Sequence, residues 1–265
     1  MSGDELVFAI DDGIATIRLN RPERLNAFTY DMLDAWAEAI ETCKREDRVR
    51  AVVLTGTGRG FCSGGDVRAM GERHHTGETA YQRKKAVHER IHRIPRLLED
   101  FDKPYIVAIN GVAVGAGLDM ALMGDIRFAA ESARMAESYI KVGLVSGDGG
   151  AWFLPRIVGV PRALELLWTG DFIDAREAER IGLVNKVLPD ERLMDHTYDF
   201  ARRLAAQPAL TLRLMKRAVY QGLRMDLRGA LDMVSSHLGV ISTTNDHREA
   251  VAAFNEKRAA KYTDS

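Results

Sequence analysis

The stretch PYIVAINGVAVGAGLDMALMGD, residues 104–125, decides the fold and much of the chemistry of this chain. It begins with an apolar, β-branched run, breaks at Asn110 and Gly111, and takes on helical character after the small residues at 115–117. We therefore expect a strand, a loop and a helix. The first N–H groups of a helix have no acceptor inside it, so they can donate to a developing anion. Asp119 lies just inside this otherwise uncharged helix, where an apolar residue would be usual.

Length and composition limit the classes of protein that the chain can belong to. Its 265 residues are 46% hydrophobic, which is enough for a full core in one large domain or in a domain with an appendage. The 37 Lys and Arg nearly balance the 38 Asp and Glu, so no overall positive field attracts nucleic acid or an anionic membrane. Glycine, asparagine and aspartate interrupt the stretch at 104–125, which disfavours a membrane span.

The cysteine content and the targeting signals of a sequence indicate the cellular compartment of the protein. Cys43 and Cys62 are too few for a disulfide framework and form no metal-ligand pair, which is typical of a reducing compartment. We see no secretory, lipidation or retention signal. We therefore expect a cytoplasmic protein with neither nucleic acid nor a membrane as a partner.

The N-terminal part reads as strands with one long helix. Two β-rich runs flank Asp11-Asp12-Gly13, which is a strong hairpin signal. After Thr29, a suitable N-cap, apolar residues recur at helical spacing. We expect strands at residues 6–10, 14–19 and 49–55 and a helix at 29–44. A Gly-rich loop follows at 56–60, but it has neither the dinucleotide spacing nor the Lys-Ser/Thr ending of a phosphate loop.

A helix is expected at residues 79–100, and it contains the string HERIH at 88–92. Such an HExxH string on a helix could place two imidazoles on zinc, with Glu89 as a base. The extended form of the motif would need a glycine at Pro95 and a third histidine at Leu98. No clear third ligand follows, so we expect no metal site and interpret the segment as a solvated helix face.

The glycine-rich loop at residues 143–150 surrounds a single acid, Asp148. An aspartate among glycines commonly caps the helix that follows, and the loop would then be only a tight turn. Alternatively, Asp148 takes part in the chemistry of the site. The residues alone leave both interpretations open.

The rest of the chain is mainly helical in pattern. We expect strands at 126–129 and 183–188, and a short helix that starts at Asp174 and ends at Gly182. From about residue 190, glycine and proline are sparse and apolar residues recur three and four apart, which predicts helices. No internal repeat or low-complexity linker is visible. We divide this α/β chain into a core at 1–195 and a C-terminal helical region at 196–265.

Four motifs occur in an order and spacing that are highly specific together. They are NRP at 20–22 with LNA at 25–27, FCSGGD at 61–66, NGVAVGAG at 110–117, and GLV at 143–145 leading to GG at 149–150 and LP at 154–155. In these motifs, and over nearly its whole length, the chain resembles the crotonase superfamily, the enoyl-CoA hydratase/isomerase family. The resemblance implies a crotonase-like spiral of stacked β-β-α turns in two near-perpendicular sheets. It also implies a C-terminal helical region that packs in homotrimers, which often pair into hexamers.

The resemblance further implies an acyl-CoA substrate whose thioester oxygen lies between two backbone N–H groups, at Gly65 and Ala116. Charge grows on that oxygen as an enolate forms, and fixed dipoles aimed at it lower the barrier. Lys257 resembles the lysine that reaches the CoA phosphates of a neighbouring subunit. The implied substrate- and CoA-binding residues are Arg24, Leu25, Ala27, Ser63, Gly64, Gly65, Asp66, Val67, Tyr139 and Lys257.

The chain departs from this pattern at the two glutamates of typical hydratases. The first maps to Asp119, which keeps a carboxylate on a shorter arm, and the second maps to Tyr139, which cannot do the same job near pH 7. Asp148 lies one position from an acid that several isomerases of the family carry. We therefore expect Asp119 and Asp148 to exchange a proton with the substrate, with burial raising one carboxyl pKa, and Tyr139 to matter less.

Three functions remain open from the sequence. The first is an enzyme that hydrates or shifts a double bond conjugated to a CoA thioester. The second is a hydrolase of the same superfamily that cleaves a thioester or a C–C bond, and the third is a non-catalytic CoA-binding scaffold. We expect no cofactor other than coenzyme A as part of the substrate.

Overall fold

The computed structural model describes residues 5–66 and 77–263, and its strands form two sheets. In the larger sheet β1 and β2 are antiparallel, and the remaining neighbours are parallel. Its order is β1 (Leu6–Asp11), β2 (Ile14–Leu19), β3 (Ala51–Gly56), β5 (Tyr105–Ile109), β7 (Ile126–Ala130) and β10 (Lys186–Leu188). The smaller sheet has the order β4 (Gly60–Cys62), β6 (Val112–Val114), β8 (Arg134–Ala136) and β9 (Ile173–Asp174).

The chain winds between the two sheets in repeated turns. In each of the pairs β3–β4, β5–β6 and β7–β8, the first strand joins the larger sheet and the second joins the smaller one. Helical segments follow each pair, which confirms the spiral of β-β-α turns that the resemblance implied. The strands β4, β6 and β8 were not predicted, because three residues are too few to show a periodic pattern.

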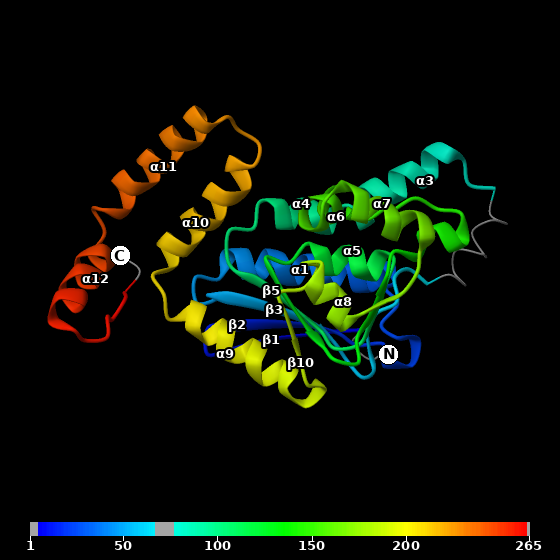
Figure 1. The fold of residues 1–265 in the computed structure, drawn as a ribbon, viewed down its shortest axis with the longest axis horizontal. Helices are drawn as coiled ribbons and strands as arrows, with labels where there is room; N and C mark the ends of the chain where they lie inside the picture. Colours follow the sequence, from blue (N-terminus) through cyan, green and yellow to red (C-terminus); the bar gives the residue numbers. More distant parts are fainter. Residues whose placement is uncertain (1–4, 67–76, 264–265) are drawn as a thin grey trace.

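Two long helices cover opposite parts of the larger sheet (Figure 1). Helix α1 (Tyr30–Arg45) packs against β1 and β2, and its N-cap is Thr29, whose hydroxyl accepts a hydrogen bond from Met32 N at 3.1 Å. Helix α9 (Leu193–Ala205) packs against β3, β5 and β7. The predicted hairpin, the first three strands and the first helix are thus confirmed to within two residues at each end.

The other helices lie beside α1, around the small sheet, or after α9 in the chain. The helix predicted at 79–100 is α3 (Ala80–Ala86), the π-helical turn η2 (Val87–Ile91) and α4 (Arg93–Glu99). The remaining helical segments of the described chain are η1 (Pro22–Arg24), α5 (Ala116–Leu122), η3 (Ser138–Val142), α6 (Gly150–Val158), α7 (Val160–Thr169), α8 (Ala175–Arg180), η4 (Asp190–Arg192), α10 (Ala209–Gly222), α11 (Leu227–Ile241) and α12 (Asn245–Glu256).

Helix α5 lies directly against the small sheet because of Gly117. A methyl group on Gly117 would lie 2.1 Å from the carbonyl oxygen of Cys62, at the end of β4, so any larger residue would push the helix away. The stretch that opened the sequence analysis thus forms β5, β6 and α5, and all seven residues of α5 are buried. The helix begins at Ala116, two residues before the apolar run that predicted it.

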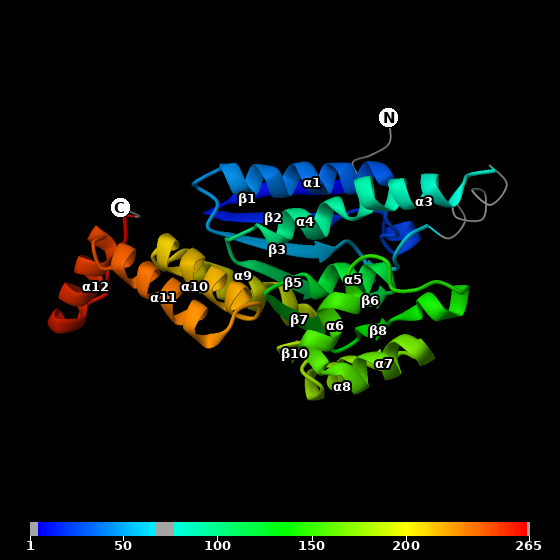
Figure 2. The ribbon, with the colours of Figure 1, turned by 90° about the horizontal axis from the view of Figure 1, so that it is seen from above.

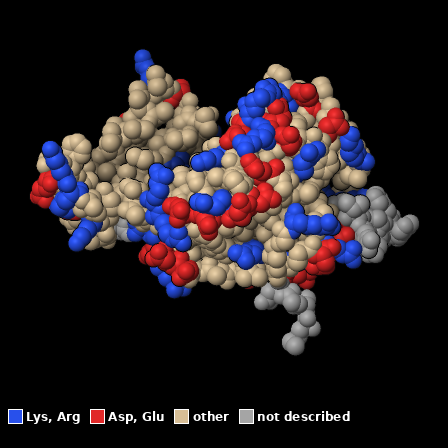
Figure 3. Space-filling view, turned by 60° about the horizontal axis from the view of Figure 1, so that its bottom comes forward, with Lys and Arg blue, Asp and Glu red and all other residues tan. Residues whose placement is uncertain are grey.

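The helices α10, α11 and α12 stand to one side of the sheets (Figures 1 and 2). Polar contacts join α10 to the core: Lys216 Nζ donates to Asp125 Oδ2 at 2.8 Å and to the carbonyl of Lys103 at 2.9 Å. Large apolar side chains on α10–α12 are exposed, while Lys and Arg alternate with Asp and Glu over the core (Figure 3). Among the described residues, no helix is long and apolar enough to cross a membrane.

Candidate active site

Three parallel strands of the small sheet end side by side and place the candidate residues together. The carboxyl end of β4 leads to Gly65, that of β6 leads to Ala116, and that of β8 leads to Tyr139. In open α/β sheets the carboxyl ends of parallel strands are where ligands bind, because the following loops and helix N-termini meet there. A methyl group on Gly115 would lie 3.8 Å from the ring of Tyr139, so the start of α5 and Tyr139 are neighbours.

The two N–H groups expected to bind an oxyanion belong to Gly65 and Ala116. Ala116 is the first residue of α5, and the first intrahelical acceptor, Gly115 O, receives its hydrogen bond from Asp119 N at 2.9 Å. The N–H of Ala116 therefore has no partner inside the helix. A methyl group on Gly64 would lie 3.4 Å from Ala116 N, which places the segment of Gly64 and Gly65 beside the start of α5.

The loop from Arg24 to Ala27 and the segment that begins at Ser63, which are both expected to bind CoA, are joined by hydrogen bonds. Ser63 N donates to Leu25 O at 2.9 Å, Ser63 Oγ donates to Arg24 O at 3.2 Å, and Phe28 N donates to Gly64 O at 2.9 Å. Asp66 follows on the same segment, and Ala27 is buried beside it, whereas Val67 lies outside the described residues.

The contacts of Asn26 explain why the LNA motif, at residues 25–27, occurs in this loop. Its backbone has φ +56°, which asparagine tolerates better than most residues, and its side chain is fully buried. The side-chain oxygen accepts from Arg21 N at 2.8 Å, and the amide nitrogen donates to Thr57 O at 2.9 Å and Gly60 O at 2.8 Å. Through these bonds Asn26 holds the loop that is predicted to bind CoA against the segment from Thr57 to Gly60.

Asp119, Tyr139 and Asp148 form one hydrogen-bonded cluster. The hydroxyl of Tyr139 lies 2.6 Å from Asp119 Oδ2 and 2.7 Å from Asp148 Oδ2. Asp119 is 0% exposed and Asp148 is 5% exposed. Asp119 Oδ2 also accepts from Ser146 Oγ at 2.9 Å and from Asp148 N at 3.2 Å.

The alternative interpretation of Asp148 as a helix cap is wrong. The N-cap of α6 is Gly149, which has no side chain to cap the helix, and the N–H of Ala151 in its first turn donates to Ser146 Oγ at 3.0 Å. The carboxyl of Asp148 points instead to the hydroxyl of Tyr139. Gly150, the first residue of α6, lies against the other acid, because a methyl group there would be 1.8 Å from Asp119 Oδ1.

Burial raises the pKa of both acids. It raises the pKa of Asp148 from 3.8 to about 6, assisted by the carboxyl of Asp119 and opposed by the hydrogen bond from Tyr139 and by His92. Burial also raises the pKa of Asp119, against the hydrogen bonds that it accepts. The pKa of Tyr139 is raised as well, because its hydroxyl is buried beside two carboxyls, so the phenol keeps its proton.

The hydrogens of this cluster can be counted. A carboxylate only accepts, so the single hydroxyl hydrogen of Tyr139 is donated to one acid, and the tyrosine oxygen can accept a hydrogen bond from the other acid only when that acid is protonated. Both contacts are therefore hydrogen bonds when the pair Asp119 and Asp148 carries one proton. In that state one carboxyl is an acid and the other is a base, which is the arrangement that proton exchange requires.

The HERIH string has partners within the chain. His88 Nε2 accepts from Arg96 Nη1 at 2.9 Å, and His92 Nε2 donates to the carbonyl of Gly147 at 2.6 Å. Glu89 pairs with Lys85 on the helix surface. No group of three His, Cys, Asp or Glu residues in the described chain could hold a metal ion. His92 instead forms a hydrogen bond with the loop that contains Asp148.

A cavity of about 590 Å³ lies between α4, α6 and α10. Apolar and aromatic side chains, including Met123, Trp152 and Phe153, line it together with charged ones such as Arg127, and it reaches Gly149. Asp119 and Asp148 do not line it. The cavity therefore reaches the residue that follows Asp148 but neither of the two acids.

Some participants were missed by sequence reasoning. Ser146 and Glu137 belong to the acid cluster, and His92 was assigned to a solvated face. Sequence patterns gave no sign of these contacts, because they join residues across separate loops and helices. Lys257 ends α12, which stands at the outer end of the C-terminal helices, away from α5 (Figures 1 and 2).

The comparisons with known proteins agree with this geometry. The sequence model of the family described as enoyl-CoA hydratase/isomerase matches residues 9–265. The chain belongs to the enoyl-CoA hydratase/isomerase family. It is 38% identical over 256 residues to the 1,2-epoxyphenylacetyl-CoA isomerase of Escherichia coli, covering 96% of each chain. It is 32% identical to the crotonyl-CoA hydratase of Syntrophomonas wolfei, covering 99% of each.

Solved structures show the same fold. A putative enoyl-CoA hydratase from Streptomyces coelicolor has a TM-score of 0.92 and 38% identity, covering 98% of this chain and 94% of that one. An enoyl-CoA hydratase from Bacillus anthracis has a TM-score of 0.92 and 32% identity, covering 99% and 100%. The crotonase fold is therefore confirmed. As a member of the enoyl-CoA hydratase/isomerase family, the protein is an enzyme that hydrates or shifts double bonds in CoA thioesters.

Proposed function

We propose that this enzyme shifts a carbon–carbon double bond in an acyl-CoA thioester, with Asp119 and Asp148 as the proton-transfer pair. The observation that supports a shift over hydration is the place of the Tyr139 hydroxyl, within 2.7 Å of both carboxyls. In a typical hydratase two glutamates handle the water and the proton. Here a phenol stands at the position of the second glutamate, and a phenol that keeps its proton cannot act as the base that activates water.

The proposed reaction starts from a thioester whose double bond is one carbon removed from conjugation. The ionised member of the pair takes a proton from the carbon next to the carbonyl, and the electron pair of that C–H bond delocalises through the double bond onto the thioester oxygen. The protonated member then gives a proton to the far end of this dienolate, and the carbonyl re-forms. The product is the conjugated enoyl-CoA, and one proton has been taken and one returned.

The N–H groups of Gly65 and Ala116 would hold the dienolate oxygen. Their position supports this role, because they follow two adjacent parallel strands and Ala116 N opens a buried helix. Fixed donors in such a site stabilise the charge that develops on the oxygen and need no reorganisation. The helix N-terminus adds a partial positive charge of the right sign.

Coenzyme A would lie along the loop of Arg24, Leu25 and Ala27 and the segment of Ser63 to Val67, with Tyr139 facing the acyl group. We propose no further cofactor. A reducing, cytoplasmic setting is part of this proposal, since Cys43 and Cys62 are both free and buried. Burial raises the pKa of Cys62 to about 12, so its thiol is unsuited to nucleophilic catalysis.

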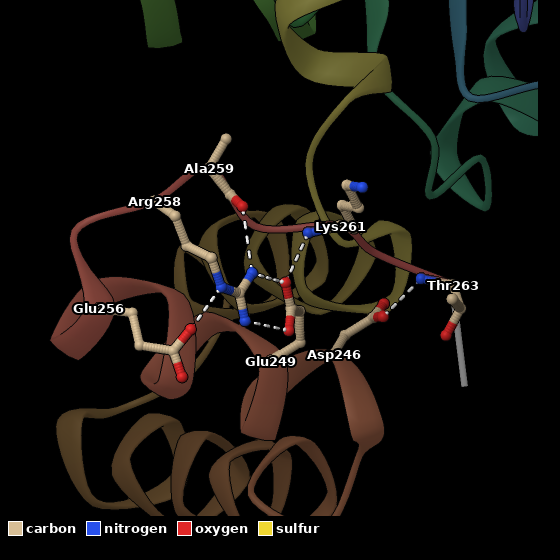
Figure 4. Close-up of polar contacts among 7 residues, drawn as sticks. All are labelled: Asp246, Glu249, Glu256, Arg258, Ala259, Lys261 and Thr263. Atoms are coloured by element: carbon tan, nitrogen blue, oxygen red, sulfur yellow. Dashed lines mark hydrogen bonds and ion pairs between the residues drawn. The ribbon is translucent and has the colours of Figure 1, made fainter.

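We also propose that the functional unit is a homotrimer or a dimer of trimers, assembled through the region 196–265. Leucines on α10 and α11 and Phe254 on α12 are exposed, the last by 85%, and a patch of this kind marks an interface. The segment after α12 is fixed: Arg258 bonds both carboxyl oxygens of Glu249, and Thr263 N donates to Asp246 Oδ1 at 2.7 Å (Figure 4). Lys257 precedes this segment and would reach a neighbour's CoA.

Incubation with a panel of acyl-CoAs tests the proposal. A double-bond shift converts 3-enoyl-CoA to 2-enoyl-CoA, whereas a hydratase converts 2-enoyl-CoA to 3-hydroxyacyl-CoA, and a thioester hydrolase releases free CoA thiol. We expect the first product to form fastest. If hydration is faster, the enzyme is a hydratase. If free CoA thiol is released, it is a thioester hydrolase, and if acyl-CoA binds without any product, the protein is a CoA-binding scaffold.

A further inference from the structure

Glu137 is a third buried carboxyl at the acid cluster, directly after β8. It is 0% exposed, and neither of its carboxyl oxygens has a conventional donor among the described residues. Asp119 Oδ1 is likewise buried and has none. A buried acceptor without a donor is costly, and three of them in one place require an explanation.

The buried side chains of Glu137 and Asp119 lie within hydrogen-bonding reach of each other, and Oδ1 is the Asp119 oxygen that has no other partner. Two carboxylates cannot bond, because both only accept, but a carboxylic acid and a carboxyl oxygen can. One proton between Glu137 and Asp119 Oδ1 therefore turns two orphaned oxygens into a hydrogen bond.

The proton belongs to Glu137 for two reasons. Asp119 accepts hydrogen bonds at Oδ2 from Tyr139, Ser146 and the backbone, and these favour its ionised form, whereas Glu137 accepts none from them. Burial raises the pKa of Glu137 to about 10, and the carboxyls of Asp119 and Asp148 raise it further. These two acids are the charged groups that act on Glu137 in the described chain, with Tyr139 and His92 beside them.

We propose that Glu137 is a positioning residue: a neutral carboxylic acid that donates its proton to Asp119 Oδ1. This bond fixes the Asp119 carboxyl so that Oδ2 alone faces Tyr139 and Ser146. The inference rests on the proposed role of Asp119 in proton transfer. It adds a residue that acts through Asp119.

The test compares Glu137→Gln with Glu137→Leu in the full-length protein. Glutamine keeps a donor for Asp119 Oδ1 and carries no charge, as protonated glutamate does, whereas leucine fills similar space without a donor. We expect Glu137→Gln to keep kcat within about threefold. We also expect it to leave unchanged the acid limb of the pH profile, which is the fall of kcat at low pH as Asp119 becomes protonated. We expect Glu137→Leu to lower kcat about tenfold or more and to move that limb to higher pH, because the ionised pair loses a hydrogen bond.

The rival arrangement, an ionised Glu137, predicts a different result. Removing a negative charge beside Asp119 would move the acid limb of Glu137→Gln to lower pH. That shift would overturn the proposal, and so would a Glu137→Leu variant with the kcat and pH profile of the unaltered protein. Melting temperatures of both variants identify any loss of folding.

Infrared difference spectra separate this inference from the proposed function. At neutral pH, the spectrum of the unaltered protein minus that of Glu137→Gln should contain the carbonyl stretch of a protonated carboxylic acid. This band requires no turnover, so it would persist even if no enoyl-CoA were converted. A carboxylate band in its place would refute the neutral state of Glu137.

Discussion

The hydroxyl of Tyr139 lies 2.6 Å from Oδ2 of Asp119, which is not the oxygen that we propose for the bond with Glu137. Its second contact, at 2.7 Å, is with Asp148. The phenol therefore connects the two acids and determines how the proton of the pair is held. We therefore propose a larger role for this hydroxyl than the sequence predicted.

Tyr139→Phe removes the hydroxyl and keeps the ring against Gly115. The two carboxyls then lose their shared partner, and two buried carboxyl oxygens lose a hydrogen bond. We expect kcat to fall about tenfold or more with a small change in KM. Steady-state kinetics on 3-enoyl-CoA measures this, and Tyr30→Phe, on the partly buried Tyr30 of α1, is a matched control. Unchanged kcat in Tyr139→Phe would show that the hydroxyl has no part in proton transfer.

Asp119→Asn and Asp148→Asn each remove one member of the pair. We expect each to lower kcat by about a hundredfold or more, the usual scale for a positioned acid or base, with little effect on substrate affinity. Asp174→Asn, at the exposed N-cap of α8, serves as a control because asparagine also caps helices. Full activity in either of the first two variants would remove that residue from the mechanism.

The pH dependence follows from the pKa of about 6 for Asp148. Below this pH the pair carries one proton, on Asp148, and the ionised Asp119 is the base. As the pH rises through about 6, Asp148 loses its proton and the pair no longer contains an acid, so kcat/KM should fall. A profile of kcat/KM from pH 5 to 9 checks this for the free enzyme. A rate that rises toward alkaline pH would mean that the doubly ionised pair is the active form.

Asp148→Asn should stabilise the protein at neutral pH. Because burial raises the pKa of Asp148 from 3.8 to about 6, the folded state holds this proton more tightly than the unfolded state, and stability is lost as the pH rises through this interval. With about 1.4 kcal/mol per pKa unit, the loss is about 3 kcal/mol, and asparagine avoids it. Melting curves at pH 4 and pH 7.5 should show the gain at the higher pH alone. A destabilised variant at pH 7.5 would contradict the burial of an ionised Asp148.

Gly65→Pro tests the oxyanion site, since proline has no N–H to donate. Losing one donor of such a site typically costs about 3 kcal/mol, so we expect kcat to fall about a hundredfold or more. Gly65→Ala keeps the N–H and is the matched control. Circular dichroism and sizing establish that both variants fold and assemble. A folded Gly65→Pro enzyme with normal kcat would refute the assignment.

Phe254→Glu tests the proposed assembly. Its side chain is 85% exposed on α12, and a buried charge at an apolar interface is costly. We expect the unaltered protein to run as a trimer or hexamer at micromolar concentration, and Phe254→Glu to shift toward smaller species. Glu256→Gln, which is also exposed on α12, is the control. A fully active monomer of the unaltered chain would contradict the proposal.

The sequence by itself determined the hairpin, the strands of the larger sheet and the long helices, because their periods extend over enough residues to be read. It also determined the family, through motifs such as LNA and the glycines at 115 and 117. One of these has a direct physical reason: only glycine at 117 lets α5 lie against Cys62.

The tertiary structure alone decided how the acids meet. Asp119 comes from α5, Glu137 and Tyr139 come from the start of η3, and Asp148 comes from the loop before α6. Their contacts depend on strands of three residues that carry no periodic signal. The same holds for His92, whose bond to Gly147 crosses from α4 to the loop before α6. Proton positions depend on burial and on the number of donors around each oxygen, and both quantities exist only once the chain has folded.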